Sequence, residues 1–194
     1  FNWVIFILLS FIWGSSFKLM KDSTALPASQ IAALRIFSAG LVFVPFAFFH
    51  TRKIPRNKLG IVILCAVFGN LLPAFLFAAA ITRLDASLAG ILNSLTPIFV
   101  AVVGIFFFKQ KISSPKITGV LTGFFGLVLL TVYPALSGER NISFNNFSYT
   151  LLILLATFLY GINVNIVGQY LKRVNPVHAA TVSLAFMTIP TAAV

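Results

Sequence analysis

The sequence predicts an all-α membrane protein, built as a multi-pass helical bundle. Of its 194 residues, 59% are hydrophobic and only 9% are charged, and the mean hydropathy is +1.02. A soluble domain of this composition lacks the polar residues needed to cover its surface. The apolar residues form runs of about 20 residues, the length that a helix needs to cross the hydrocarbon core of a bilayer. These runs are hydrophobic all round, which excludes amphipathic helices lying on a surface.

Six such runs are complete and a seventh begins. We expect spans near residues 3–20, 30–49, 59–82, 86–108, 116–134 and 148–170, with the next starting at about 177. The first run is predicted to be a span rather than a signal peptide, because no basic leader precedes it and five more spans follow. Only Arg83-Leu84-Asp85 is clearly polar between the third and fourth spans. These two spans should therefore form a tight antiparallel hairpin.

The charges of the connections between spans predict how the chain is oriented in the membrane. The connections after the second, fourth and sixth spans carry no acidic residue and nine basic ones: Arg52, Lys53, Arg56, Lys58, Lys109, Lys111, Lys116, Lys172 and Arg173. The three acids, Asp22, Asp85 and Glu139, all fall on the opposite side. Because Lys and Arg are retained on the cytoplasmic side, we expect a cytoplasmic amino terminus in the cytoplasmic (inner or plasma) membrane. This topology explains the net charge of +11 better than nucleic-acid binding, which needs a solvated basic surface.

Two stretches of the chain read alike. Residues 8–14, LLSFIWG, are similar to residues 155–161, LATFLYG. Each stretch is followed by polar residues and a proline, Pro27 after the first and Pro176 after the second. Five spans separate the two starts, so the second copy would run in the opposite direction, as in the inverted repeats of secondary transporters. We expect a first repeat of five spans over 1–134, an outer connection over 135–147, and the start of a second repeat over 148–194. The chain begins with Phe1 and stops inside an apolar run, so we expect it to be a fragment.

Several motifs resemble one transporter family. Residues 84–113, LDASLAGILNSLTPIFVAVVGIFFFKQKIS, are similar to the fourth-span region of EamA-type transporters in the drug/metabolite transporter (DMT) superfamily. Trp13-Gly14-Ser15-Ser16-Phe17 resembles their first-span motif, and Pro27 with Leu34-Arg35-Ile36-Phe37 resembles the start of their second span. The resemblance implies ten spans in two inverted five-span halves, around a central path for small metabolites or drugs, and it implies export. The chain departs from the family at Lys109-Gln110-Lys111, where a Gly-Glu-like step is common, so no carboxylate is expected to act there.

Polar side chains inside spans are the candidates for a substrate site, because each must face protein or a wet cavity. The aromatic residues Trp13 and Tyr160 stand at matching places in the two similar stretches. Our hypothesis is that the substrate path is lined by Trp13, Asn70, Asn93, Thr96, Tyr160 and Asn163. An amide offers both a donor and an acceptor to a polar substrate. The alternative is that these groups join helices by hydrogen bonds worth about 0.6–2 kcal/mol each.

Two prolines in mid-span predict helix kinks. Pro73 and Pro97 each remove a backbone donor and free a carbonyl in the preceding turn. Asn70 stands three residues before Pro73, and Asn93 stands four before Pro97. Kinked helices lining a cavity would show this placement, and a purely structural bend is the alternative.

Arg35 and a stripe of glycines are further features of the spans. A charge at Arg35, about five residues into the second span, must snorkel or find a partner. Snorkelling to the outer interface is favoured here over attraction of an anionic group of the substrate. Gly119, Gly123 and Gly126 predict close helix contact, by default within the bundle and otherwise with a second copy in a homodimer.

No catalytic residues or metal ligands emerge from the sequence. There is no phosphate-binding loop, and Cys65, His50 and His178 have no metal-ligand spacing. We therefore expect no enzyme activity, no cofactor and no metal. The sequence predicts a secondary transporter whose partners are a small-molecule substrate and the lipid bilayer, with no nucleic acid. The alternative is a membrane scaffold or complex subunit that transports nothing.

Overall fold

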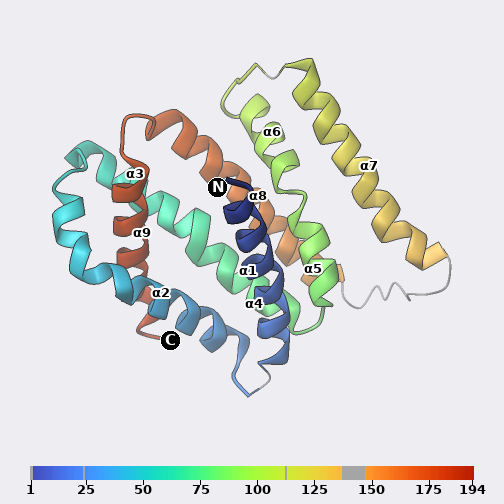
Figure 1. Cartoon of the computed structure of the whole chain (residues 1–194), viewed down its shortest axis with the longest axis horizontal. Helices are drawn as coiled ribbons and strands as arrows, with labels where there is room; N and C mark the ends of the chain where they lie inside the picture. Colours follow the sequence, from blue (N-terminus) through green and yellow to red (C-terminus); the bar gives the residue numbers. More distant parts are fainter. Residues whose placement is uncertain (1, 24, 112, 137–146) are drawn as a thin grey trace.

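The computed structural model describes residues 2–23, 25–111, 113–136 and 147–194, and within this part all regular elements are helical (Figure 1). In chain order the elements are α1 (Asn2–Asp22), α2 (Ala28–Thr51), α3 (Arg56–Ala66), a π-helical segment (Val67–Leu71), α4 (Leu72–Ile81), α5 (Ala86–Asn93), α6 (Thr96–Phe106), α7 (Ser114–Leu136), α8 (Phe147–Tyr170) and α9 (Pro176–Thr191). The predicted all-α class is confirmed.

Five segments of the described chain are long and apolar enough to cross a membrane. They are Trp3–Asp22, Ala28–Thr51, Arg56–Ile81, Leu88–Phe106 and Phe147–Tyr170. Each falls on one of the expected spans, and α7 covers the remaining expected span at 116–134. α9 begins at Pro176, close to the expected start of the next run. The chain is therefore a multi-pass helical membrane protein.

The hairpin expected between the third and fourth spans is confirmed. α4 ends at Ile81 and α5 begins at Ala86. The backbone N–H of Leu84 donates to the Ala80 carbonyl at 2.9 Å, and Leu84 itself is buried. Lys21, at the end of α1, donates to the carbonyls of Ile81 and Leu84 at 3.0 and 3.1 Å. A cation satisfies the open carbonyls at a helix carboxyl end, so α1 is joined to the hairpin at this point.

Both mid-span prolines lie next to irregular backbone. Pro73 is in the first turn of α4, directly after the π-helical segment Val67–Leu71, so the third span is one helix with a wide turn in it. Pro97 is in the first turn of α6, and residues 94–95 separate α6 from α5. A proline is tolerated at the start of a helix, where its missing N–H would have no partner. The expected run at 86–108 is thus two shorter helices rather than a single bent one.

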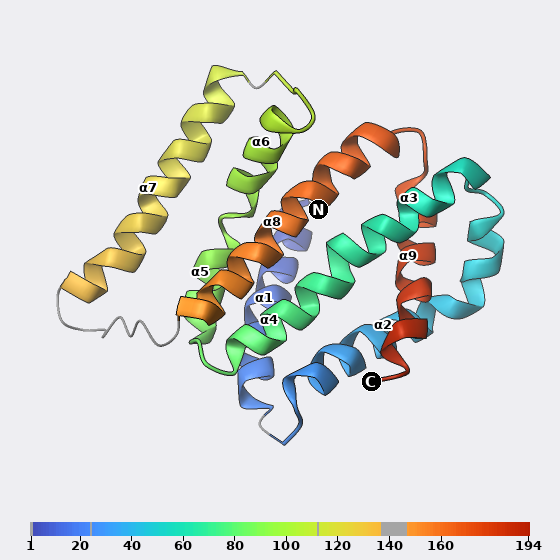
Figure 2. The ribbon, with the colours of Figure 1, turned by 180° about the vertical axis from the view of Figure 1, so that it is seen from behind.

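α8 is the central helix of the bundle. It lies between α4 and α6, while α9 packs along α2 and against α3 (Figure 2). Two glycines allow especially close contact: a Cβ added at Gly161 would lie 2.8 Å from the Phe99 carbonyl carbon, and one at Gly40 would lie 2.5 Å from the Leu184 carbonyl oxygen. Small residues let helix backbones approach in this way.

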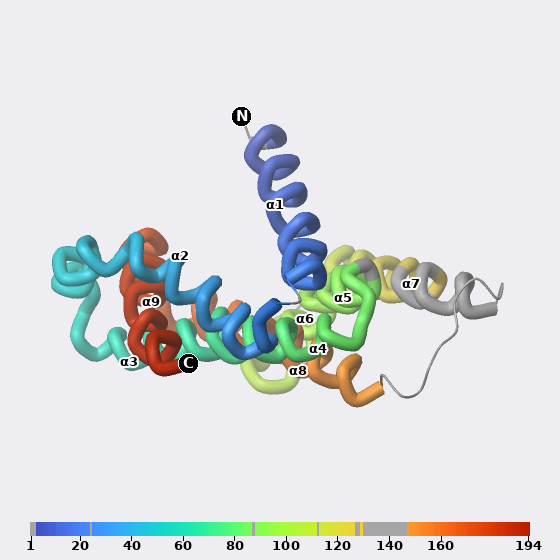
Figure 3. Tube along the Cα trace, turned by 90° about the horizontal axis from the view of Figure 1, so that it is seen from below, coloured from blue at the N-terminus to red at the C-terminus, as the bar shows by residue number. Residues whose placement is uncertain are grey.

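α1 stands apart from the other helices. Seen from below, it projects out of the layer that they form (Figure 3). Its amino-terminal residues are exposed, as at Phe11 with 78% of its surface accessible, whereas Met20 near its other end is 7% accessible. The Phe17 ring lies 5.6 Å from the Phe77 ring of α4. α1 is therefore anchored to the bundle through its carboxyl-terminal turns.

The close packing expected at the glycine stripe inside the bundle is not present. A Cβ added at Gly119, Gly123 or Gly126 would meet nothing within 4 Å. Gly119 and Gly123 instead border a gap of about 410 Å³ between α6 and α7. Small residues permit close approach, but they do not supply a partner that fills the space. Most of the outer connection expected at 135–147, including Glu139 and Arg140, lies outside the described residues.

Candidate functional site

A cavity of about 180 Å³ lies where α1, α2, α4, α5 and α8 meet, and we call it the Arg35 cavity. Its lining residues are Trp13, Ser16, Phe17, Met20, Arg35, Ala74, Phe77, Asn93 and Tyr160. Three of the six predicted site residues are thereby brought together: Trp13 from α1, Asn93 from the end of α5, and Tyr160 from α8. These residues are far apart in the sequence and become neighbours only through the packing of the helices.

Arg35 lines this cavity, and part of its side chain is exposed. It lies about 10 Å along α2 from Ala28, at 1.5 Å per residue. One guanidinium nitrogen donates to the Ser16 hydroxyl at 2.8 Å, and the other contacts the Met20 sulfur. Both partners belong to the carboxyl-terminal turns of α1. The expected snorkelling of Arg35 to the outer interface stays a prediction.

Aromatic rings form one wall of the cavity. The Tyr160 ring stacks on Phe77 with 6.3 Å between ring centroids, and Phe77 in turn meets Phe17. Trp13 adds a ring from α1 and remains 63% exposed. The wall is therefore apolar, with a hydroxyl from Tyr160 and an indole N–H from Trp13 as its polar groups.

Thr96 does not line the cavity. Its hydroxyl donates to the backbone carbonyl of Asn93 at 2.7 Å and lies 3.5 Å from the Asn93 amide oxygen. The hydroxyl thus bridges the interruption between α5 and α6, just before Pro97. Asn93 itself is at the last turn of α5, where the break in the helix leaves its side chain beside the cavity.

Asn70 and Asn163 belong to a second cleft of about 290 Å³, which we call the Asn163 cleft. Three parts of the bundle border it: α3 together with the π-helical segment, α8, and α9. The Asn163 amide oxygen is buried and has no hydrogen-bond partner among the described residues, and its amide packs against Gly69 of the π-helical segment. The six predicted residues therefore divide between the two sites, with Thr96 in neither.

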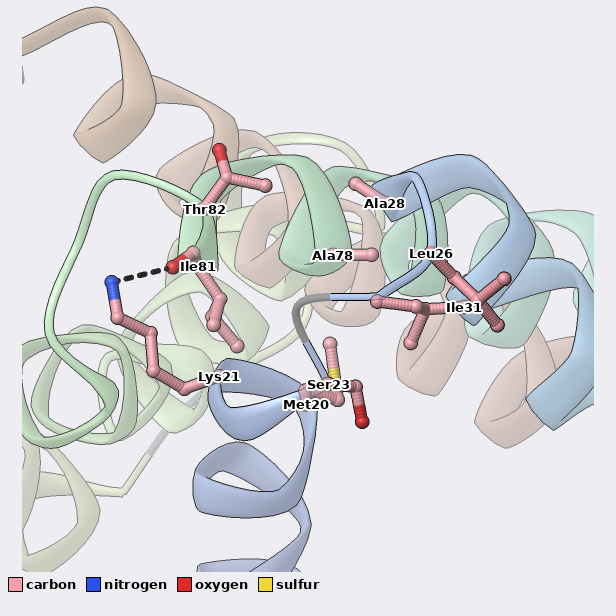
Figure 4. Close-up of a pocket in the computed structure, with 9 residues that line it drawn as sticks. All are labelled: Met20, Lys21, Ser23, Leu26, Ala28, Ile31, Ala78, Ile81 and Thr82. Atoms are coloured by element: carbon pink, nitrogen blue, oxygen red, sulfur yellow. Dashed lines mark hydrogen bonds between the residues drawn. The ribbon is translucent and has the colours of Figure 1, made fainter.

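A third pocket adjoins the Arg35 cavity. It measures about 260 Å³ and is lined by residues from the end of α1, the start of α2 and the end of α4 (Figure 4). Lys21 extends to its hydrogen bond with the Ile81 carbonyl at the edge of this pocket. Met20 borders both spaces, so its flexible thioether separates the pocket from the Arg35 cavity.

An amide network joins α6 to α8. The Gln110 side chain donates to the Asn165 amide oxygen at 2.9 Å, and the Asn165 amide nitrogen donates to the carbonyls of Val100 and Gly161 at 2.9 and 2.8 Å. Asn165 is 3% exposed, and Lys109, beside Gln110, has a positive φ of 50°. Asn165 is not among the six residues predicted to line the substrate path. Here it holds helices together.

A histidine pair was missed by sequence reasoning. The Nδ1 atoms of His50, at the end of α2, and His178, at the start of α9, lie 2.8 Å apart. These residues are 128 positions apart, and no local pattern links them. In the part of the chain that the structure describes, no group of three or more His, Cys, Asp or Glu side chains could hold a metal ion.

The described helices are long and apolar enough to cross a membrane and enclose a cavity with polar groups in its wall, an arrangement found in membrane transport proteins. Comparison with known proteins gives the family. Residues 2–132 match the EamA-like transporter family, and the chain belongs to that family. The resemblance recognised in the sequence is therefore confirmed.

Relatives of this chain come from distant organisms. It is 31% identical over 148 residues to a WAT1-related chloroplastic protein of Arabidopsis thaliana, covering 73% of this chain and 35% of that one. It is 30% identical over 142 residues to a probable amino-acid metabolite efflux pump of Escherichia coli, covering 71% and 44%. An uncharacterized transporter of Archaeoglobus fulgidus is 23% identical over 190 residues, covering 97% and 65%. The chain thus spans about one third to two thirds of the length of these relatives. No solved structure matches it significantly.

Proposed function

We propose that the protein is a secondary transporter that exports a small metabolite across the cytoplasmic membrane, with the Arg35 cavity as part of its substrate site. The observation that carries this proposal is the meeting of Trp13, Asn93 and Tyr160 around one cavity with Arg35. Polar groups at membrane depth are costly and mark substrate paths. The cavity of about 180 Å³ is smaller than the roughly 300–1,000 Å³ of sites for drug-sized ligands, which favours a small metabolite.

Two other observations support the direction of transport and the orientation of the chain in the membrane. One relative is named a probable amino-acid metabolite efflux pump, which favours export of a small polar compound. The nine basic residues on one side favour a cytoplasmic amino terminus. The π-helical segment Val67–Leu71 and the break at 94–95 interrupt regular helix next to the two clefts, and we expect the helices to bend there during alternating access.

The alternative is a membrane scaffold or complex subunit that transports nothing. The network of Gln110 and Asn165 favours it in one respect, because the Asn165 amide, inside the span formed by α8, makes hydrogen bonds that join helices. Under this alternative, the polar residues of the Arg35 cavity would contribute to stability alone.

Flux measurements on the full-length protein in vesicles separate the two functions. Vesicles are loaded with a defined mixture of labelled amino acids and organic acids, and release is followed with and without the protein. We expect Asn93→Leu to abolish release while the protein inserts normally, because leucine removes the amide and fills space in the cavity. Ser38→Leu is the matched control, since Ser38 is exposed on α2 and lies outside the Arg35 cavity. Undiminished release by Asn93→Leu would remove Asn93 from the site, and no release by the unaltered protein would favour the scaffold.

A further inference from the structure

We propose that the gap between α6 and α7 binds an acyl chain of an anionic phospholipid whose phosphate contacts Lys111 and Lys116. We call this gap the α6–α7 groove, and its volume is about 410 Å³. The lipid site is separate from the Arg35 cavity and does not depend on which substrate is transported. The position of α7, the walls of the groove and the two lysines at one end point to this ligand.

α7 lies at one edge of the bundle and leaves the groove open. It is the outermost helix on its side and runs beside α6 (Figures 1 and 2). Residues of both helices that line the groove are exposed, as at Pro97 of α6 and Gly123 of α7. An opening at the edge of a membrane-spanning bundle meets lipid, so hydrocarbon is the material at hand to fill it.

The walls of the groove are mostly apolar. The Ser94 hydroxyl, at one end, donates to the Ile91 carbonyl at 2.6 Å. The Gln110 amide, at the other end, donates to Asn165. These polar groups already have partners inside the protein, so a polar ligand would gain little from them. The apolar lining residues are Pro97, Ile98, Val100, Ala101 and Val120. Such walls fit an acyl chain.

The groove reaches far enough into the span to hold much of an acyl chain. Lys116 and Gly123 both border it, and they are about 10 Å apart along α7 at 1.5 Å per residue. Half of the hydrocarbon core of a bilayer is about 15 Å thick. The groove therefore covers most of the depth of one leaflet, starting from the end that carries the lysines.

Lys111 and Lys116 give this end a positive charge that no acidic residue offsets. Both side chains are exposed, and the sequence has no Asp or Glu at positions 86–138. In the part of the chain that the structure describes, neither lysine forms an ion pair. The turn before them is fixed, because the Gln110 backbone N–H donates to the Gly104 carbonyl at 2.9 Å. Basic residues at the end of a span attract anionic headgroups, and the amino end of α7 adds the positive end of a helix dipole.

A second copy of the chain is a less favourable occupant of the groove. Two copies related by an axis along the membrane normal would bring the lysine ends of their grooves together. The segment offers no acidic residue to offset these charges, so the contact would be repulsive. A phosphate is attracted by the same charges. The lysine end is also the predicted cytoplasmic end, where anionic lipids give the membrane surface a negative potential.

The test measures lipid binding to the full-length protein in detergent micelles by native mass spectrometry. The probes are phosphatidylglycerol, phosphatidylcholine with the same acyl chains, and soluble glycerol phosphate. We expect the protein to retain phosphatidylglycerol under conditions that release phosphatidylcholine, and to retain no glycerol phosphate. Equal retention of the two lipids would overturn the proposal, as would retention of glycerol phosphate, which would indicate a site for soluble anions. Failure to retain either lipid would show that the groove is filled in another way.

Variants of the lysines test the headgroup contact. Lys111→Gln combined with Lys116→Gln should weaken phosphatidylglycerol binding about 25-fold, from a factor of about five for each lysine. Lys53→Gln combined with Lys172→Gln is the matched control, because both of these lysines are exposed and lie outside the groove. The proposal is refuted if the two double variants bind phosphatidylglycerol equally well.

A second pair of variants tests the acyl chain without changing the charge. Gly123→Leu places a side chain in the groove and should weaken phosphatidylglycerol binding, whereas Gly126→Leu, outside the groove lining, should not. A Cβ added at either glycine meets nothing within 4 Å, so both variants should fold, which circular dichroism checks. Equal binding by these two variants would show that no acyl chain occupies the groove.

Discussion

Adding one methyl group at Gly161 tests the contact on which the position of α8 depends. In Gly161→Ala the new Cβ would lie 2.8 Å from the carbonyl carbon of Phe99 and 3.0 Å from its carbonyl oxygen. These are backbone atoms, so α6 must move away from α8. Overpacking of this kind costs about 1–3 kcal/mol. The better helix propensity of alanine returns up to about 1 kcal/mol. We expect a net loss of about 1–2 kcal/mol in the free energy of unfolding.

The same helix provides the control. A Cβ added at Gly168 meets nothing within 4 Å, so Gly168→Ala should keep only the propensity gain and be as stable as the parent protein or more so. Both variants of the full-length protein are unfolded by titrating dodecyl sulfate into mixed micelles, with helicity followed by circular dichroism. The reasoning is refuted if Gly161→Ala is as stable as Gly168→Ala, because the close approach of α6 and α8 would then not exist.

Three further outcomes follow from contacts within the bundle. Asn165→Ala should lower the free energy of unfolding by about 1–3 kcal/mol, because it leaves buried carbonyls and Gln110 without their partner; an unchanged titration midpoint would contradict this. Lys109→Gly should raise the free energy of unfolding by about 0.5–1 kcal/mol, since glycine adopts a φ of 50° without strain. A decrease would contradict the idea that Lys109 is strained in this turn. The Nδ1 atoms of His50 and His178 share one hydrogen bond, so His178→Ala should lower the free energy of unfolding by about 0.5–1.5 kcal/mol. Equal stability of the two proteins would disprove this contribution.

Most of the helical architecture could be predicted from the sequence, because the length of an apolar run and the position of a proline are local properties. The spans, the tight turn at Leu84 and the irregular backbone near Pro73 and Pro97 all depend on residues close together in the chain. The repeat, the division into 1–134, 135–147 and 148–194, and the cytoplasmic amino terminus stay predictions, since the fold of the described residues does not test them.

The arrangement of the site could be predicted only in part. Polar residues inside spans were recognised as candidates, but their grouping depends on position along α8. Tyr160 and Asn163 are one turn apart, and this turn is enough to place Tyr160 beside Phe77 of α4 and Asn163 beside Gly69 of the π-helical segment. The direction of Arg35 and the histidine pair depend on which helices cross, and apolar periodicity contains no information about that.

The partnership of early and late helices has a consequence for biosynthesis. α2 packs along α9, and α4 packs along α8, so these later helices cover surfaces presented by the earlier ones. While the ribosome is still translating the segment before Phe147, α2 and α4 lie in the bilayer without these neighbours. Their small residues and polar groups must meanwhile face lipid or an insertion factor. The contacts of α2 with α9 and of α4 with α8 therefore form only after α8 and α9 have been inserted.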